Sequence, residues 1–219
     1  MFDFFFHFRL INLMHKIFYI IIFVVGFAIL TVAVFFTSEF YASKWQSERL
    51  LKEELRDTAG KSWNLSQLKE KFGIIYFGYT YCPDICPTAL NDLSIALKGM
   101  GSDQNLYQPI FISIDPERDT PQIIKEYILN FDQNLLGLTG TSAQLKSFTF
   151  NLGSTYTLQK KNVNDEDYTV DHTIGYFMVN STGQKLLVPI RSNTKDLRDV
   201  ITKVKNRILA NSASEWKNR

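Results

Sequence analysis

The residues of this chain that could do chemistry gather in one short motif. The only two cysteines stand in the segment CPDICP, residues 82–87. Each cysteine precedes a proline, which disfavours a helical backbone, so the segment predicts a helix that begins at Pro87. Cys86 would then lie near the helix N-terminus, where the positive end of the helix dipole stabilises thiolates. The motif therefore predicts a metal or redox centre.

The first alternative is a purely structural disulfide between Cys82 and Cys86, because an even cysteine count is typical of exported proteins. A bridge that closes so short a loop would constrain little chain entropy and stabilise little. The three intervening residues also depart from the two-residue spacing of thioredoxin-type redox motifs. Two thiolates with an imidazole suit copper, especially Cu(I). Zinc is the alternative metal, although structural zinc usually has four protein ligands.

His172 is the candidate imidazole ligand. Of the three histidines, His7 and His15 precede a long apolar segment, and only His172 follows it. His172 comes after a polar loop (160–168) and at the mouth of an expected strand, a common location for ligands. Its neighbour Asp171 is a candidate to orient the imidazole through a hydrogen bond, with an ordinary solvated carboxylate as the alternative.

The apolar segment predicts a membrane anchor at residues 17–37. About 20 uncharged residues in a helix span about 30 Å, the thickness of a bilayer core. No small-x-small cleavage site follows, so we expect the anchor to be retained. Positive charges precede the segment, and Glu39 is the first charge after it. The positive-inside rule then places residues 1–16 in the cytoplasm and exports the rest. A mitochondrial presequence would be long and Arg-rich, whereas residues 1–16 are short and aromatic, so we expect a bacterial inner-membrane protein whose domain faces the periplasm.

The exported part is predicted to be one domain on a stalk. Residues 38–60 are polar and charged, as expected of a stalk or a first helix, and residues 61–210 are enough for one core, followed by a tail at 211–219. The chain has 24 Lys and Arg against 22 Asp and Glu. This balance gives no basic field for nucleic acid, so we expect no nucleic-acid partner.

Apolar runs and turn signals predict an alternation of strands and helices in this domain. Buried strands are expected at 74–77 and 110–114, with no strand before the first of them. Thr141 and Gln144 predict a capping box for a helix that ends at Gly153. The other expected elements are helices at 87–100, from Pro121 and at the C-terminal end (with Leu197, Ile201, Val204 and Ile208 inward), and a hairpin of 173–179 with 184–190. This pattern is typical of an α/β domain.

Four segments, in this order, resemble the Sco/SenC family: YFGYTYCPDICP (76–87), FISIDPERDTP (111–121), GLTGT (137–141) and VDHT (170–173). The resemblance implies a thioredoxin-like fold and a membrane-tethered copper protein that helps to assemble the dinuclear copper centre of cytochrome c oxidase. It implies that Cys82, Cys86 and His172 bind copper, as Cu(I), Cu(II) or both. The segment 51–71 departs from the family pattern, because it lacks the expected Phe-x-Leu-x-Asp strand.

The expected function is therefore that of a metallochaperone and not of an enzyme, with the copper-centre subunit of cytochrome c oxidase as partner. The alternative is a thiol–disulfide oxidoreductase, in which Cys82 and Cys86 are a redox pair that reduces the cysteines of the acceptor. Thioredoxin-like oxidoreductases place a cis-proline opposite their cysteines. This chain has no proline between Pro121 and Pro189, which favours metal binding.

Overall fold

The computed structural model describes residues 2–162, 167–190 and 193–217 of the chain. It divides into two compact units, Met1–Trp45 and Gln46–Arg219. Helix α1 (Phe2–Lys52) forms the first unit as far as Trp45, and its last residues, from Gln46 on, belong to the second unit. Within α1, Tyr19–Ser38 has a mean hydropathy of 2.9 and is not buried, so its length and composition suit a membrane span. The helix thus agrees with the anchor predicted at 17–37.

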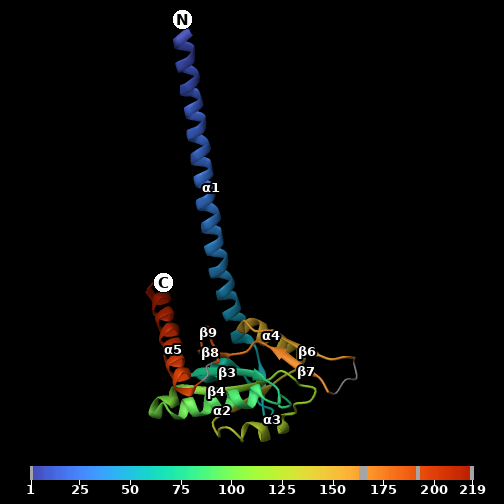
Figure 1. Ribbon diagram of the computed structural model, residues 1–219. Coiled ribbons are helices and arrows are strands. Elements are labelled where there is room, and N and C mark those ends of the chain that lie inside the picture. Colours follow the sequence, from blue (N-terminus) through green and yellow to red (C-terminus); the bar gives the residue numbers. More distant parts are fainter. Residues whose placement is uncertain (1, 163–166, 191–192, 218–219) are drawn as a thin grey trace. The chain divides into compact units, whose positions relative to one another are not determined.

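The second unit contains a seven-stranded sheet with the strand order β2-β1-β5-β4-β3-β8-β9. Figure 1 labels β3, β4, β8 and β9 of this sheet, with α2 (Ile85–Lys98) beside it. The three central strands β5, β4 and β3 are parallel, and the outer pairs are antiparallel. The strands are β1 (Leu55–Asp57), β2 (Ser62–Trp63), β3 (Phe72–Gly78), β4 (Tyr107–Ser113), β5 (Leu136–Thr139), β8 (Tyr176–Val179) and β9 (Lys185–Val188). Two more strands, β6 (Tyr156–Gln159) and β7 (Thr169–His172), form a separate antiparallel sheet.

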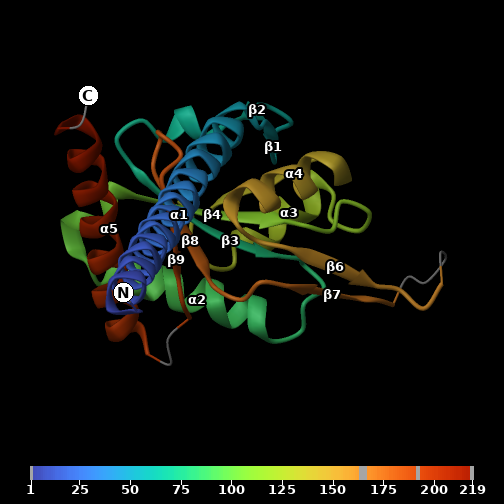
Figure 2. The same ribbon diagram turned by 90° about the horizontal axis from the view of Figure 1, so that it is seen from above.

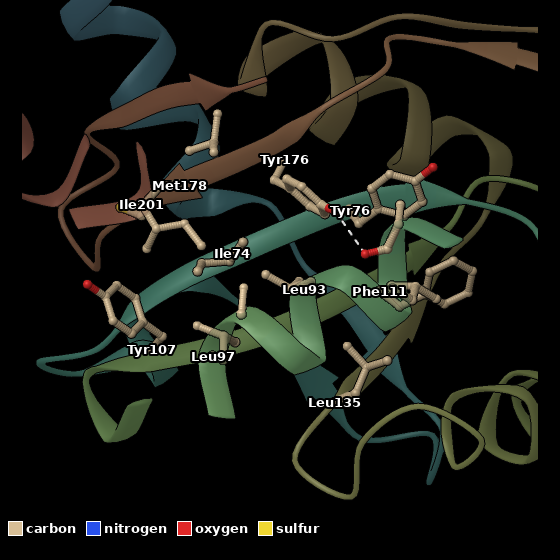
Figure 3. Packing of buried hydrophobic residues seen from close by; sticks show 14 of the residues in the cluster. Ile74, Tyr76, Leu93, Leu97, Tyr107, Phe111, Leu135, Tyr176, Met178 and Ile201 are labelled. Carbon is tan, nitrogen blue, oxygen red and sulfur yellow. Dashed lines mark hydrogen bonds between the residues drawn. The ribbon is translucent and has the colours of Figure 1, made fainter. Parts of the chain in front are cut away.

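Hydrophobic cores lie on both faces of the main sheet, because successive side chains of a strand point to opposite faces. Ile74 and Tyr76 of β3 belong to one cluster, and Ile75 and Phe77 to the other. Figure 3 shows the first cluster, in which the Tyr176 hydroxyl donates a hydrogen bond of 2.8 Å to the Ala89 carbonyl. The first cluster includes residues of α2 (Ile85–Lys98), α3 (Pro121–Ile128) and α5 (Thr194–Lys217), and the second includes residues of α4 (Ser142–Leu152). Short 3-10 helices occupy Leu65–Leu68 and Gly101–Leu106.

This arrangement confirms the predicted α/β fold of the thioredoxin-like type. The capping box of Thr141 with Gln144 is present, and Gly153 ends α4 in the left-handed conformation. The predicted hairpin is also present as β8 and β9, although its first strand begins at Tyr176 rather than at Thr173. In the final helix, Leu197, Ile201 and Ile208 are buried, as predicted, and Val204 packs against the same cluster.

The predicted start of the helix after the cysteine motif was wrong by two residues. Helix α2 begins at Ile85, so Cys86 lies in its first turn and Pro87 is the third helical residue. A proline in the first helical turn lacks only an N–H that would have no intrahelical partner. The restriction that Pro87 places on Cys86 is therefore a preference, and the tertiary structure overrides it.

The prediction of no strand before residue 74 was also wrong. Strand β1 pairs with β5 through Arg56 and Thr139, and it pairs with β2 through Leu55 and Trp63. These strands of three and two residues are too short to show a period in the sequence. The stretch 46–60, assigned above to a stalk, lies in the second compact unit.

The β6–β7 hairpin is the second feature that the sequence pattern missed. Its strands flank the predicted polar loop at 160–168, of which residues 163–166 lie outside the described structure. Strand β7 ends at His172, so the candidate ligand belongs to this small sheet and not to the seven-stranded one. Figure 2 shows β6 and β7 side by side, extending beyond the main sheet.

Candidate metal centre

The two cysteines lie together where strand β3 leads into helix α2. The loop after Gly78 turns tightly, and the Cys82 amide donates a hydrogen bond of 3.2 Å to the Tyr79 carbonyl. The Cys86 amide in the first turn of α2 then donates to the Cys82 sulfur at 3.4 Å. Cys82 is half-buried, Cys86 is fully buried, and both are free thiols. The fold thus holds two sulfurs at one helix N-terminus, as the motif predicted.

Aromatic residues and one glycine surround the Cys86 sulfur. A Cβ atom built at Gly78 would lie 3.0 Å from the sulfur, 3.0 Å from the Phe111 ring and 3.3 Å from the Tyr76 ring. The absence of a side chain at Gly78 therefore makes room for the sulfur between the strands. The hydroxyl groups of Tyr76 and Tyr127 are buried, and neither has a hydrogen-bond partner among the described residues.

Burial changes the protonation expected of this pair. Burial first, and the neighbouring Cys82 second, raise the pKa of the Cys86 thiol to about 12. The favourable position at the helix N-terminus does not compensate for the loss of water around the sulfur. The stabilised Cys86 thiolate expected from the sequence is therefore wrong for the metal-free protein. A metal ion that binds here must displace a proton from Cys86, so its binding depends on pH.

His172 presents a neutral imidazole at the end of β7. Its ring packs edge-to-face on Tyr76 with 6.0 Å between the centroids. Its Nδ1 lies 3.0 Å from the Thr173 carbonyl, which can only accept, so Nδ1 carries the proton and Nε2 carries a lone pair. Burial lowers the pKa of His172, which favours the same neutral form. A neutral imidazole with a lone pair on Nε2 is the state that binds metal ions.

Asp171 does not make the hydrogen bond that orients this ring in the described structure. Asp171 precedes His172 on strand β7, so the two side chains point to opposite faces. The Asp171 carboxylate accepts a hydrogen bond of 2.7 Å from Gln159 on the paired strand. The Thr173 carbonyl, and not Asp171 as the sequence suggested, accepts the hydrogen bond from His172 Nδ1.

The structure brings the two sulfurs together and places the imidazole one aromatic ring away. Tyr76 contacts His172 with its ring and also borders the space beside the Cys86 sulfur. Within residues 2–162, 167–190 and 193–217, no three His, Cys, Asp or Glu side chains converge closely enough to hold a metal ion. Two thiols and one imidazole fit copper by their chemistry. To share one ion, the imidazole has to approach the sulfurs more closely.

Sequence reasoning gave no role to the charged loop 115–120 between β4 and α3, but the structure shows what it contacts. The Asp119 carboxylate is buried and accepts three hydrogen bonds, from the Thr80 amide at 2.9 Å and from the hydroxyls of Thr80 and Ser113 at 2.5 Å. Thr80 lies two residues before Cys82, so Asp119 anchors the start of the cysteine loop. The cluster of charges in a segment next to a predicted strand was the available signal.

Comparison with known proteins places this arrangement in a family. The family model SCO1/SenC matches residues 51–209, so the chain belongs to the SCO1/SenC family. It is 34% identical over 166 residues to the mitochondrial protein SCO2 of Saccharomyces cerevisiae, covering 75% of this chain and 54% of that protein. It is 37% identical over 133 residues to an SCO2-like protein of Rickettsia felis, covering 61% and 65%. The chain thus spans less than two thirds of the length of these relatives.

Solved structures show the same fold. Copper-bound ScoI of Arabidopsis thaliana matches with a TM-score of 0.63 and 32% identity, over 71% of this chain and 96% of that one. Copper-bound ScoI of Bradyrhizobium japonicum matches with a TM-score of 0.61 and 35% identity, over 68% and 96%. Copper-bound Sco1 of yeast matches with a TM-score of 0.63 and 33% identity, over 70% and 86%. These matches support the thioredoxin-like fold inferred above.

Proposed function

We propose that this chain is a copper-binding metallochaperone that helps to assemble the dinuclear copper centre of cytochrome c oxidase. Its cargo would be bound by the sulfurs of Cys82 and Cys86 and by Nε2 of His172. The acceptor would be the copper-centre subunit of the oxidase. In this proposal Asp171 acts indirectly, through its charge near the imidazole.

The observation that carries the proposal is the pair of free thiols with a neutral imidazole one aromatic ring away. The Cys86 amide lies 3.4 Å from the Cys82 sulfur, so the sulfurs are held together without a bridge. The lone pair of His172 Nε2 is available because Nδ1 bonds to the Thr173 carbonyl. Soft sulfur ligands select Cu(I), and an added imidazole extends the site to Cu(II). Copper-bound structures of three relatives support the same cargo here.

Metal binding by the full-length chain in detergent tests the cargo. We expect about one copper ion per chain after reduction, and loss of tight binding in Cys82→Ala and in Cys86→Ala. The oxidised protein should bind little Cu(I) until it is reduced, because a disulfide offers no thiolate. Tight stoichiometric copper binding that survives both cysteine substitutions would remove Cys82 and Cys86 as ligands, and a reduced unsubstituted protein that binds no copper would remove copper from the proposal.

Membrane attachment is the second part of the proposal. Tyr19–Ser38 is long and apolar enough to cross a bilayer once, and the charges before it favour a cytoplasmic N-terminus. The domain would then face the periplasm of a bacterium. Protease added to spheroplasts should digest the domain while the chain fractionates with membranes. A domain that resists protease until the membrane is broken would contradict this orientation.

The alternative function is thiol–disulfide exchange with the acceptor. A reductase needs both cysteines but does not need the imidazole, so His172→Ala separates the two functions. In a strain that depends on this protein, the chaperone proposal expects oxidase activity to fall in His172→Ala as it does in Cys82→Ala. Normal activity in His172→Ala beside failure of Cys82→Ala would assign the function to thiol chemistry.

A further inference from the structure

The guanidinium group of Arg118 lies at the junction of the two segments that carry the candidate ligands. Its Nε donates a hydrogen bond of 2.6 Å to Asp115, a fully buried carboxylate in the same loop. Its Nη1 donates a hydrogen bond of 3.0 Å to the Tyr168 carbonyl. Tyr168 closes the ring of contacts, because its hydroxyl donates a hydrogen bond of 2.5 Å to the other oxygen of Asp115.

Aromatic rings surround this guanidinium group. The central carbon of Arg118 lies 3.6 Å from the centroid of the Tyr168 ring, close enough for stacking. It lies 5.0 Å from the ring of Tyr81 and 5.6 Å from that of Tyr79. Tyr81 directly precedes Cys82, and Tyr168 directly precedes strand β7. One side chain thus contacts the cysteine loop and the strand that ends at His172.

The hairpin that carries His172 depends on such contacts for its position. Among the described residues, strands β6 and β7 pair only with each other, so backbone hydrogen bonds of the main sheet do not fix them. A two-stranded hairpin is marginally stable by itself. Buried side chains of β7 and its neighbourhood, such as Val170, hold it against the core. On the β6 side, Lys160 forms an ion pair with Glu117 of the charged loop and lies 4.4 Å from the centroid of the Tyr168 ring.

We propose that Arg118 is a positioning residue for copper binding, which sets how closely the His172 imidazole approaches the cysteine pair. The inference rests on the proposed function. Arg118 fixes Tyr168 relative to the loop 115–120, and Asp119 of the same loop fixes Thr80 near Cys82. The loop is therefore a common frame for both ligand-bearing segments. Without Arg118, the two sulfurs keep their positions, but the β6–β7 hairpin is no longer held at a fixed position relative to them.

This proposal predicts a selective defect in Cu(II) binding. In the full-length chain in detergent, Arg118→Gln should weaken Cu(II) binding about tenfold, because substitutions that disturb ligand orientation cost at least that much. Cu(I) needs mainly the two sulfurs, so its affinity should change less than about threefold. The electron paramagnetic resonance spectrum of the Cu(II) form should show weaker nitrogen coupling. A role in general stability would not alter that coupling.

Arg118→Lys and Arg198→Gln are the informative companions. Lysine keeps the charge but loses the planar fork that bonds and stacks, so Arg118→Lys should remain defective. Arg198 on helix α5 also donates a hydrogen bond to a backbone carbonyl, that of Gly99, at 2.9 Å. Arg198→Gln should therefore bind Cu(I) and Cu(II) with the same affinities as the unsubstituted protein. Wild-type Cu(II) affinity and spectrum in Arg118→Gln or Arg118→Lys would overturn the proposal, as would an equal loss of Cu(I) and Cu(II).

Tyr168→Phe decides the matter if the Arg118 variants do not fold. It keeps the ring and removes only the hydroxyl bonded to Asp115, so it should weaken Cu(II) about threefold and leave Cu(I) unchanged. An unchanged Cu(II) affinity in Tyr168→Phe would then overturn the proposal. Cys82→Ala separates this failure from that of the proposed function: copper binding that survives Cys82→Ala rejects the function itself. If Cys82→Ala loses copper binding while the Arg118 and Tyr168 variants bind Cu(I) and Cu(II) normally, only the positioning role is rejected.

Discussion

The two parts of the candidate copper site are held by different kinds of structure. The cysteines follow a strand in the middle of the main sheet and enter the first turn of a packed helix, with Cys86 fully buried. His172 ends a two-stranded hairpin that side-chain contacts hold against the loop 115–120 and the core. The sulfurs therefore have a fixed frame, whereas the position of the imidazole can change with those contacts. This difference suits the proposed chaperone, which would first hold copper and then release it.

The largest effect on the difference between the two regions is expected when the imidazole is removed. His172→Ala should weaken Cu(II) more than about 100-fold, because a lost ligand costs more than a disturbed one. Cu(I) should lose much less, since two thiolates can hold it alone. Competition with chelators specific for each oxidation state measures both affinities. Unchanged Cu(II) affinity in His172→Ala would remove His172 from the site and end the comparison.

The fixed frame of the sulfurs predicts a strong effect at Gly78. Gly78→Ala should lower the affinity for Cu(I) about tenfold and cost about 1–3 kcal/mol of stability, because its Cβ would meet the Cys86 sulfur at 3.0 Å. Gly73→Ala is the matched control on the same strand, since its Cβ would meet Leu68 at 3.1 Å and Val179 at 3.3 Å. It should lose similar stability and keep its Cu(I) affinity. Equal copper defects in both variants would show that the effect is not local to the sulfur.

The loop 115–120 contacts both regions, and the pH dependence of stability at Asp119 tests its contribution. Burial raises the pKa of Asp119 above its usual 3.8, and the nearby Asp115 raises it further, so the folded protein holds this proton more tightly than the unfolded chain. The stability that the proton contributes is complete below pH 3.8 and is lost as pH rises through the folded pKa. Denaturant unfolding should show the advantage of the unsubstituted protein over Asp119→Asn shrinking across that window. A difference that stays constant or grows with pH would contradict this account.

The smallest effect is expected outside both regions, at the N-terminal cap of α4. Thr141→Ala removes the hydroxyl that accepts from the Gln144 amide and should cost about 1 kcal/mol of stability. Copper affinity should not change, because α4 carries no candidate ligand. Thermal unfolding and copper titration of the same sample check both outcomes. A copper defect in Thr141→Ala would mean that global stability, and not local position, controls the site.

The sequence by itself determined the strong, local features of this protein. The apolar segment, the buried strands, the capping box and the cysteine motif all depend on neighbouring residues, so their patterns can be read from the chain. The resemblance in four segments identified the family, and the family model over residues 51–209 confirms it. The short strands β1 and β2 and the hairpin β6–β7 carried too few residues to show a period.

Only the tertiary structure decided how the ligand candidates are supported. The fully buried setting of Cys86, which raises its thiol pKa, depends on residues from several strands. The contact of Arg118 with Tyr168 joins residues 50 positions apart, which no local pattern encodes. The partner of the His172 imidazole is likewise the Thr173 carbonyl because strand geometry turns Asp171 to the other face. Burial, pairing and orientation are properties of the packed fold, and for that reason the sequence named the ligands but not the frame that positions them.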